Sequence, residues 1–167
     1  MIDNFYDIKP LEDWLTEESG LICQNANAFV ALNVVPSSFG HALVVSKRVV
    51  YKATDLTPEE LWGLERAKEV GMEQLRILIT RTPDRITELY KRWAGDERLN
   101  AKVPCKTRIE IVMKDLEKDG NFGDGQVFEN HGSRAGQMVR QYHRQIVPRH
   151  RSDLNGAGEA LFQYLHR

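Results

Sequence analysis

Near its carboxyl end the chain places one histidine between two glutamines, Gln141, His143 and Gln145, at a spacing of two residues. Alternate side chains of a β-strand share one face, so these three would project together on a strand. A neutral imidazole is a potential nucleophile, and carboxamide N–H groups can stabilise charge that develops on an oxygen. The pattern predicts a small reaction site with His143 at its centre.

A glycine-containing loop lies directly before these polar residues. Gly132 and Gly136 flank the short segment Ser133-Arg134-Ala135. Glycine lets backbone N–H groups come close to a ligand, and a loop of this kind can hold an anion. The loop and the following strand therefore predict one anion site.

The elements that position this site can be read from hydrophobic spacing. Residues 57–60, Thr-Pro-Glu-Glu, are a typical helix start, and apolar residues three and four apart predict a long helix to about Ile79. A second helix is predicted from Thr82 to Gly95, followed by irregular chain over 96–106 and a loop over 119–125. Strands are predicted over 21–23, 29–35, 42–46, 107–114, 126–130 and 137–147.

The charge balance excludes several classes of protein. The 167 residues carry 23 Lys and Arg against 24 Asp and Glu, a formal net charge of −1. Binding along nucleic acid normally shows as a basic excess, so no long nucleic acid partner is expected. No apolar run approaches the roughly 20 residues of a membrane span, and the two cysteines are far apart, which favours the cytoplasm.

Two blocks of sequence carry a family resemblance. In the first, a strand reaches Asn33 and Pro36 and is followed by Gly40-His41-Ala42-Leu43-Val44. In the second, Gly136-Gln137-Met138-Val139 precedes Gln141-Tyr142-His143-Arg144-Gln145. The first block is similar to a pattern of the histidine triad (HIT) family, the nucleotide hydrolases and transferases, in which a strand and a Pro precede Gly-His-x-Leu-Val. The second block is similar to the same family's Gly-Gln-x-Val followed by His-x-His-x-His.

The resemblance implies an α+β fold, an antiparallel sheet of about five strands with a long packed helix. It also implies one HIT-like domain over residues 1–167, with an insertion around 80–110. His143 occupies the position of the family nucleophile, and His41 would support the site from behind. The residues expected to contact the nucleotide are Asn33, Asn130, Gln137, Gln141 and Gln145.

The chain departs from the family pattern in ways that bear on chemistry. Glutamine replaces both outer histidines, although the last position has precedent in the branch of galactose-1-phosphate uridylyltransferase. Gln141 and Gln145 can donate hydrogen bonds but cannot deliver a proton, and general acid help is typically worth about 10²–10⁴-fold. Leaving groups that need little protonation, such as phosphate, are therefore expected to be favoured over amines.

The function expected from these residues is that of a nucleotide hydrolase or nucleotidyltransferase. His143 would attack the α-phosphate and form a covalent nucleotidyl intermediate. The resemblance implies a purine mononucleotide portion, no cofactor, no metal and a homodimer. One alternative is a non-catalytic nucleotide-sensing or interaction module with a degenerate site. Another is a scaffold that ignores nucleotides, which a cavity filled by side chains would favour.

The region from Ile86 to Lys106 is longer than the connection usual in small HIT proteins. It contains the basic residues Lys91, Arg92, Arg98, Lys102 and Lys106. Two interpretations remain open, a solvated helix and loop, or a basic flap that holds a second phosphate-bearing part of the substrate.

Overall fold

Five strands form one antiparallel sheet in the order β1-β2-β3-β5-β4. This computed structural model describes residues 1–119, 122–128 and 138–150. The strands are β1 Leu21–Gln24, β2 Ala28–Leu32, β3 Ala42–Ser46, β4 Phe122–Phe128 and β5 His143–His150. Strands β2 and β3 are buried along their whole length, so they form the centre of the core. The predicted α+β class and antiparallel sheet are confirmed.

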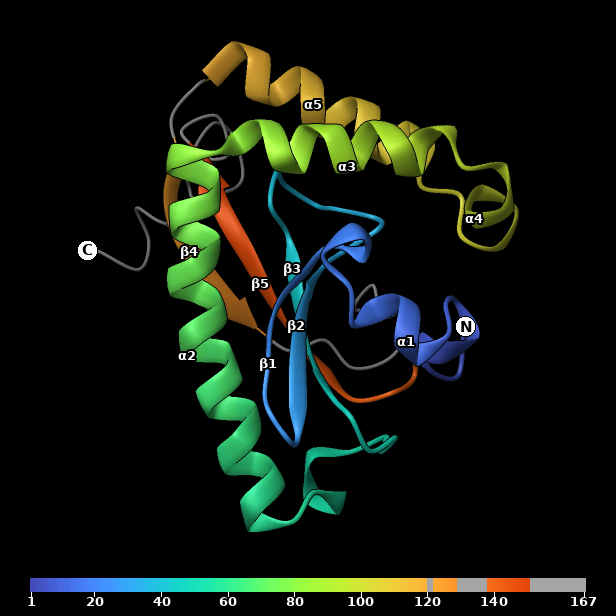
Figure 1. Cartoon of the computed structure of the whole chain (residues 1–167), viewed down its shortest axis with the longest axis vertical. Coiled ribbons are helices and arrows are strands. Elements are labelled where there is room, and N and C mark those ends of the chain that lie inside the picture. Colours follow the sequence, from blue (N-terminus) through green and yellow to red (C-terminus); the bar gives the residue numbers. More distant parts are fainter. Residues whose placement is uncertain (120–121, 129–137, 151–167) are drawn as a thin grey trace, which may run out of the picture.

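The long helix α2, Pro58–Arg81, covers one face of the sheet (Figure 1). It begins where the sequence predicts, because the Thr57 side chain accepts from the Glu60 amide and the Glu60 side chain accepts from the Thr57 amide. Gly71 faces Val30 of β2, and a Cβ there would lie 2.9 Å from both Val30 methyl carbons. Glycine thus lets the helix approach the sheet closely.

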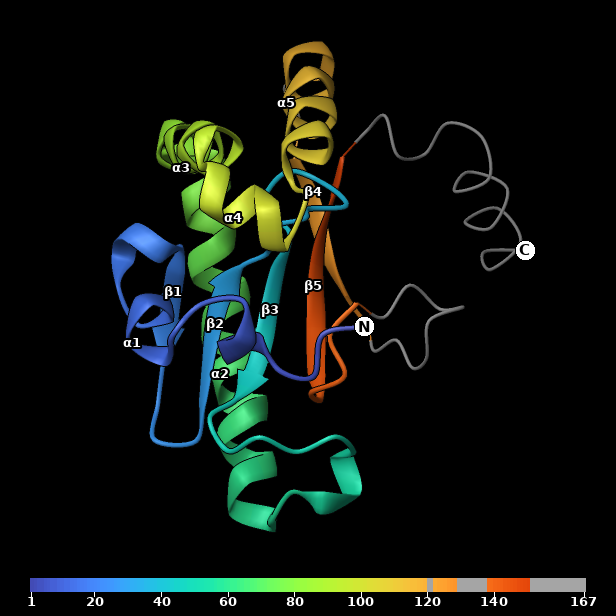
Figure 2. The same ribbon diagram turned by 90° about the vertical axis from the view of Figure 1, so that its right-hand side faces the viewer.

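The first twenty residues cover the opposite face of the sheet (Figure 2). They form the 3-10 turn η1 Phe5–Asp7, the short helix α1 Leu11–Trp14 and the 3-10 turn η2 Glu17–Ser19. Phe5, Ile8 and Trp14 are buried beneath this segment. A parallel bridge joins Ile2 to Val139, so the segment is tied to the chain just before β5.

Three helices connect α2 to β4 and lie across one end of the sheet (Figures 1 and 2). They are α3 Pro83–Gly95, α4 Glu97–Lys102 and α5 Lys106–Asp119, and a 3-10 turn, η3 Ala53–Asp55, precedes α2. The helix predicted over 82–95 is confirmed. The irregular chain predicted over 96–106 is wrong in part, because the Asp96 side chain caps α4 by accepting from the Leu99 amide at 3.0 Å.

The strand predicted over 107–114 is helical instead. Ile109 and Val112 face the core with Cys105, which precedes the helix, at a helical spacing of four and three residues. Ile111, which the strand pattern would place beside Ile109, is 43% exposed. Packing of α5 against α3 selects the helical period over the alternating one.

Two predicted boundaries near the site also shift. The loop predicted over 119–125 overlaps β4, whose pairing with β5 absorbs the glycines through a register shift between Phe122 and Gly125. The strand predicted from 137 begins only at His143, so Gln141 lies in the bend before it. In the described part of the chain, no helix is long and apolar enough to cross a membrane.

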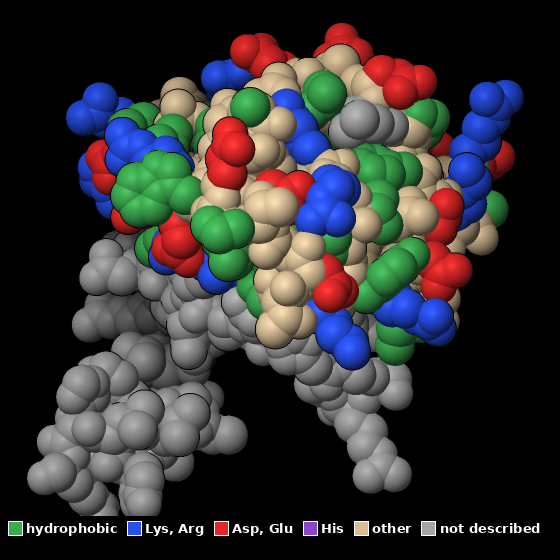
Figure 3. All heavy atoms as spheres, turned by 90° about the horizontal axis from the view of Figure 1, so that it is seen from below, with side chains coloured by type: hydrophobic (Ala, Val, Ile, Leu, Met, Phe, Trp, Pro, Cys, Tyr) green, Lys and Arg blue, Asp and Glu red, His purple; other side chains and the backbone are tan. Residues whose placement is uncertain are grey.

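Figure 3 shows the end of the molecule opposite helices α3–α5. Hydrophobic side chains occur there in small groups among acidic and basic ones, without a broad surface of one charge. Charge on this face is therefore mixed, in keeping with the near balance of 23 basic and 24 acidic residues.

Candidate functional site

A small cavity of about 90 Å³ lies between the N-terminal segment and the sheet. It brings together four residues that the sequence singled out, Asn33, His41, His143 and Gln145. The remaining wall contains one further polar residue, Ser37, and ten apolar residues, namely Ile2, Phe5, Ile8, Trp14, Val34, Val35, Leu43, Val103, Met138 and Val139. No side chain in this lining carries a permanent charge.

The ring of His143 is held in one tautomer by the backbone. Its Nδ1 lies 2.7 Å from the carbonyl oxygen of Gln141. Because a carbonyl oxygen can only accept, Nδ1 must carry a proton, and in the neutral imidazole the lone pair lies on Nε2. The nucleophilic atom of the neutral ring is therefore Nε2.

Phe5 covers the imidazole. The two ring centroids are 4.9 Å apart at an interplanar angle of 86°, an edge-to-face contact. His143 is only 6% exposed as a result. Ligand pockets are typically about 300–1,000 Å³, so a nucleotide needs more room than this conformation offers. In this conformation the Phe5 ring occupies part of the space beside His143.

Gln141 lies behind the cavity rather than on its wall. Its side chain is fully buried, with Oε1 accepting from the Phe5 amide at 2.9 Å and Nε2 donating to the Ser46 carbonyl at 3.1 Å. The predicted contact between the Gln141 carboxamide and a phosphate does not fit this arrangement, because both ends of the amide bind backbone. Since Gln141 precedes β5, it does not share the strand face of His143.

His41 on the cavity wall is neutral and has one polar atom without a partner. Its Nδ1 accepts from the Ser37 amide at 2.9 Å, so the proton resides on Nε2. Burial lowers the pKa of His41 to about 4, an effect that the neighbouring Gln145 partly offsets. Nε2 makes no hydrogen bond of good geometry to a described residue although the side chain is 1% exposed. An acceptor oxygen of a ligand would satisfy this donor.

Asn33 follows β2 and forms a turn. Its Oδ1 accepts from the Val35 amide at 3.0 Å, and its own amide donates to the His41 carbonyl at 2.7 Å. In the described part of the chain its Nδ2 makes no hydrogen bond, so this group can still donate to a ligand hydroxyl at the cavity.

Gln145 lies two residues beyond His143 on β5 and lines the same cavity. It is 7% exposed and opposes Leu43 of β3. Together Gln145, His41 and His143 offer donors and one nucleophilic nitrogen within a largely apolar pocket. Asn130 and Gln137, also predicted from the sequence, lie outside the described residues.

The N-terminal segment and the α4–α5 connection supply cavity residues that motif reasoning missed. Phe5, Ile8 and Trp14 come from the first segment and Val103 from the second. Their sequence signal is one apolar residue or a pair of them within polar chain, which predicts burial but not a cavity. Tertiary packing alone brings them to the sheet face that carries His143.

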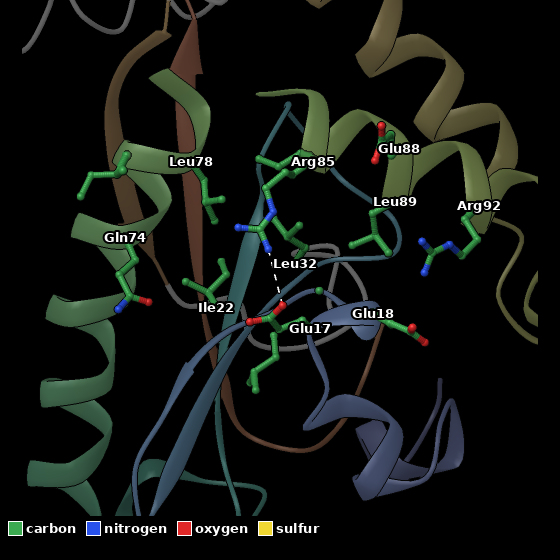
Figure 4. A pocket seen from close by; sticks show the side chains of 14 residues that line it. Glu17, Glu18, Ile22, Leu32, Gln74, Leu78, Arg85, Glu88, Leu89 and Arg92 are labelled. Atoms are coloured by element: carbon green, nitrogen blue, oxygen red, sulfur yellow. Dashed lines mark ion pairs between the residues drawn. The ribbon is translucent and has the colours of Figure 1, made fainter. Parts of the chain in front are cut away.

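A larger groove of about 450 Å³ lies elsewhere, between α2, α3 and the edge strand β1 (Figure 4). Arg85 of α3 and Glu17 of η2 form an ion pair across it, with 3.6 Å between Nη2 and Oε2. It contains none of the residues that the motifs identify, and it offers no nucleophile. We therefore place the candidate site in the smaller cavity.

Other reactive groups are poorly suited to chemistry. Burial raises the pKa of Cys23 to about 11 and also raises that of Cys105, so both thiols stay protonated near neutral pH. Within the described ranges, no cluster of three or more His, Cys, Asp or Glu residues could hold a metal ion.

Comparisons with known proteins agree with the fold and the motifs. The family model described as HIT domain matches residues 15–152. Comparison with curated protein sequences returned no match. A hypothetical protein from Leishmania major has a similar solved structure, with a TM-score of 0.50 and 17% identity over 86% of this chain and 72% of that chain.

Two other solved structures are similar at lower scores. A zinc-bound histidine triad family protein from Mycobacterium smegmatis has a TM-score of 0.46 and 19% identity over 83% of this chain and 71% of that chain. A histidine triad nucleotide-binding protein from Candida albicans has a TM-score of 0.46 and 15% identity over 86% of this chain and 73% of that chain.

Proposed function

Because the chain belongs to the histidine triad family, we propose that it binds a purine nucleotide and attacks its α-phosphate through Nε2 of His143. The attack forms a P–N bond and breaks the bond between the α-phosphorus and the leaving oxygen, which departs with the electron pair. Water or another acceptor then releases the nucleotide from His143. The enzyme is thus a phosphohydrolase or nucleotidyltransferase.

The observation that carries this proposal is the hydrogen bond of 2.7 Å between Nδ1 of His143 and the Gln141 carbonyl. In the neutral ring it directs the lone pair to Nε2 before substrate binds, so that atom can attack without a change of tautomer. Two groups support the same chemistry by donating to phosphate oxygens, the buried Nε2–H of His41 and the Gln145 carboxamide. Gln141 acts as a positioning residue through its backbone carbonyl.

The remaining family properties are part of the proposal. Asn33, Asn130 and Gln137 bind the sugar or the phosphate, and the chain forms one HIT-like domain over 1–167 with an insertion around 80–110. It acts in the cytoplasm as a homodimer, without a metal or cofactor. Light scattering coupled to size-exclusion chromatography tests the dimer, and a monomer at micromolar concentration would contradict it.

A covalent adduct tests the catalytic role. The protein is incubated with ATP, a diadenosine polyphosphate and an adenosine phosphoramidate, and intact mass and peptide mapping follow. An AMP adduct on the peptide that contains His143, lost in His143→Ala, is the expected result. Saturable binding without adduct or product release would contradict the enzyme.

One observation favours the second candidate, a nucleotide-sensing module without turnover. The cavity is only about 90 Å³, and the Phe5 ring lies against His143. A sensor would use the movement of the N-terminal segment as its signal and would need no chemistry. The same experiment separates the two, because the sensor predicts that His143→Ala changes neither product nor adduct formation.

A further inference from the structure

Arg108 links the helices α3–α5 to the wall of the candidate site. From α5 it donates through Nε to the Pro36 carbonyl at 2.8 Å and through Nη2 to the Ser37 carbonyl at 2.9 Å. The connection from β2 to β3 carries these carbonyls together with the three polar cavity residues Asn33, Ser37 and His41. The guanidinium is therefore fixed at the edge of the cavity.

The guanidinium of Arg108 has more N–H donors than its contacts with the β2–β3 connection use. A guanidinium has five N–H groups, and the two contacts to the loop use two of them. The other three make no hydrogen bond to a described residue, and no described carboxylate lies within 4.0 Å of the side chain. Arg108 thus presents an uncompensated positive charge on a side chain whose position is set by the backbone.

The described residues that line the cavity offer a polyphosphate no fixed positive charge. Its described lining consists of apolar residues with Asn33, Ser37, His41, His143 and Gln145, none of which carries a permanent charge. The positive charge of Arg108 acts on His41 in the cavity wall, because Arg108, like His143, contributes to lowering the pKa of His41. Each phosphate beyond the first adds negative charge that a cation at the edge of the cavity can balance.

We propose that Arg108 is a specificity-determining residue that binds the phosphate next to the α-phosphate and so selects nucleotides with a phosphoanhydride. This inference rests on the proposed function. When His143 attacks the α-phosphorus, the bridging oxygen leaves with its electron pair on the β-phosphate. Arg108 stabilises that charge without donating a proton. Such stabilisation suits this site, because Gln145 stands where a histidine could have protonated the leaving group.

The proposal accounts for a part of the helical region that the motifs do not explain. The basic flap interpretation considered Lys91, Arg92, Arg98, Lys102 and Lys106. Of these, Arg92 lines the separate groove between α2 and α3. Arg108 instead contacts the β2–β3 connection directly. In this proposal its guanidinium alone binds the second phosphate, the role that the flap interpretation gave to several basic residues.

Paired binding measurements test this inference. Wild type, Arg108→Gln, Arg108→Lys and Arg66→Gln are titrated calorimetrically with AMP and with α,β-methylene ATP, which keeps the β-phosphate but resists cleavage. Arg66→Gln is a matched control, because it makes the same charge change at an exposed arginine of α2 that pairs with Glu69. Unfolding midpoints confirm that each variant is folded.

Wild type and Arg66→Gln are expected to bind the ATP analogue about tenfold or more tightly than AMP. Arg108→Gln removes this advantage and leaves AMP affinity within about twofold, while Arg108→Lys retains part of it. An equal loss for both ligands, or an unchanged ratio, would overturn the role of Arg108 while leaving nucleotide binding intact. If wild type binds neither ligand, the proposed function fails as well.

Discussion

The Phe5 amide donates a hydrogen bond of 2.9 Å to Oε1 of Gln141, and both groups are buried. Through this contact Gln141 holds the N-terminal segment, whose Phe5 ring covers His143. The Gln141 carbonyl meanwhile fixes the His143 ring. One residue therefore links the cover of the site to its reactive atom.

Replacing Gln141 by alanine should loosen the N-terminal segment. The variant leaves the Phe5 amide and the Ser46 carbonyl buried without a partner, which costs about 1–3 kcal/mol of unfolding free energy. Urea unfolding measures this loss. Hydrogen exchange should accelerate at the Phe5 amide and remain slow at Val44 in the central strand β3. Unchanged exchange at Phe5 would show that Gln141 does not hold the segment.

The buried neutral state of His41 predicts a pH-dependent stability. Burial lowers its pKa to about 4 in the folded protein, whereas an unfolded histidine titrates near 6.5. Between these values the unfolded chain binds more protons, so stability is present in full above pH 6.5 and falls as pH drops toward 4. The shift corresponds to about 3 kcal/mol.

Urea unfolding at pH 4.5 and pH 7 tests this dependence. His41→Gln should be less stable than wild type at pH 7 and should lose less stability between the two pH values. Other groups contribute to the wild-type slope, so the difference between the two proteins is the informative quantity. Identical slopes would mean that His41 is not the group whose protonation opposes folding.

Local signals in the sequence are strong enough to predict the central part of the fold. The Thr57 and Glu60 capping box, the helix-ending Gly95 and the apolar runs of β2 and β3 each specify one structure without help from distant residues. The segment 107–114 fits both an alternating and a helical pattern. Burial of Ile109 and Val112 where α5 packs against α3 decides between them, and no local signal encodes that packing.

The candidate site is predictable in its motif and not in its geometry. The spacing identified His143 and Gln145, which do line one cavity. It also grouped Gln141 with them, because the alternation argument assumed a strand that begins six residues too early. The cover formed by Phe5 and the clamp formed by Arg108 depend on contacts over 136 and about 71 residues of chain. Spacing within one motif does not encode such contacts.

Gly71 should be intolerant of a side chain. Its Cβ would lie 2.9 Å from Val30, whose branched side chain is buried in β2. Overpacking of this kind costs about 1–3 kcal/mol, against a helix-propensity gain of about 1 kcal/mol for alanine. Gly71→Ala should thus lower stability by about 1 kcal/mol. Gly95→Ala is the control, because nothing lies within 4 Å of its Cβ, and it should be neutral or stabilising. Equal effects in urea unfolding would contradict the close approach of α2.

Among the described residues that line the cavity with His143, none is placed as a general acid at neutral pH, and this predicts a preference among leaving groups. Of the described residues on the cavity wall, Gln145 cannot protonate a leaving group, and His41 is neutral at pH 7 with a pKa of about 4. Wild type should therefore cleave ATP or a diadenosine polyphosphate in preference to an adenosine phosphoramidate, whose amine needs a proton. Steady-state kcat/KM for the two substrate types measures this ratio.

Gln145→His installs the missing acid and should change the ratio. We expect kcat for the phosphoramidate to rise by about 10²-fold or more, because general acid catalysis typically contributes about 10²–10⁴-fold. The anhydride gains little, since phosphate leaves without protonation. Gln145→Asn controls for altered packing, because it changes the side chain without adding an acid, and should raise neither rate. A wild-type preference for the phosphoramidate, or equal gains in both variants, would mean that leaving-group protonation does not limit this site.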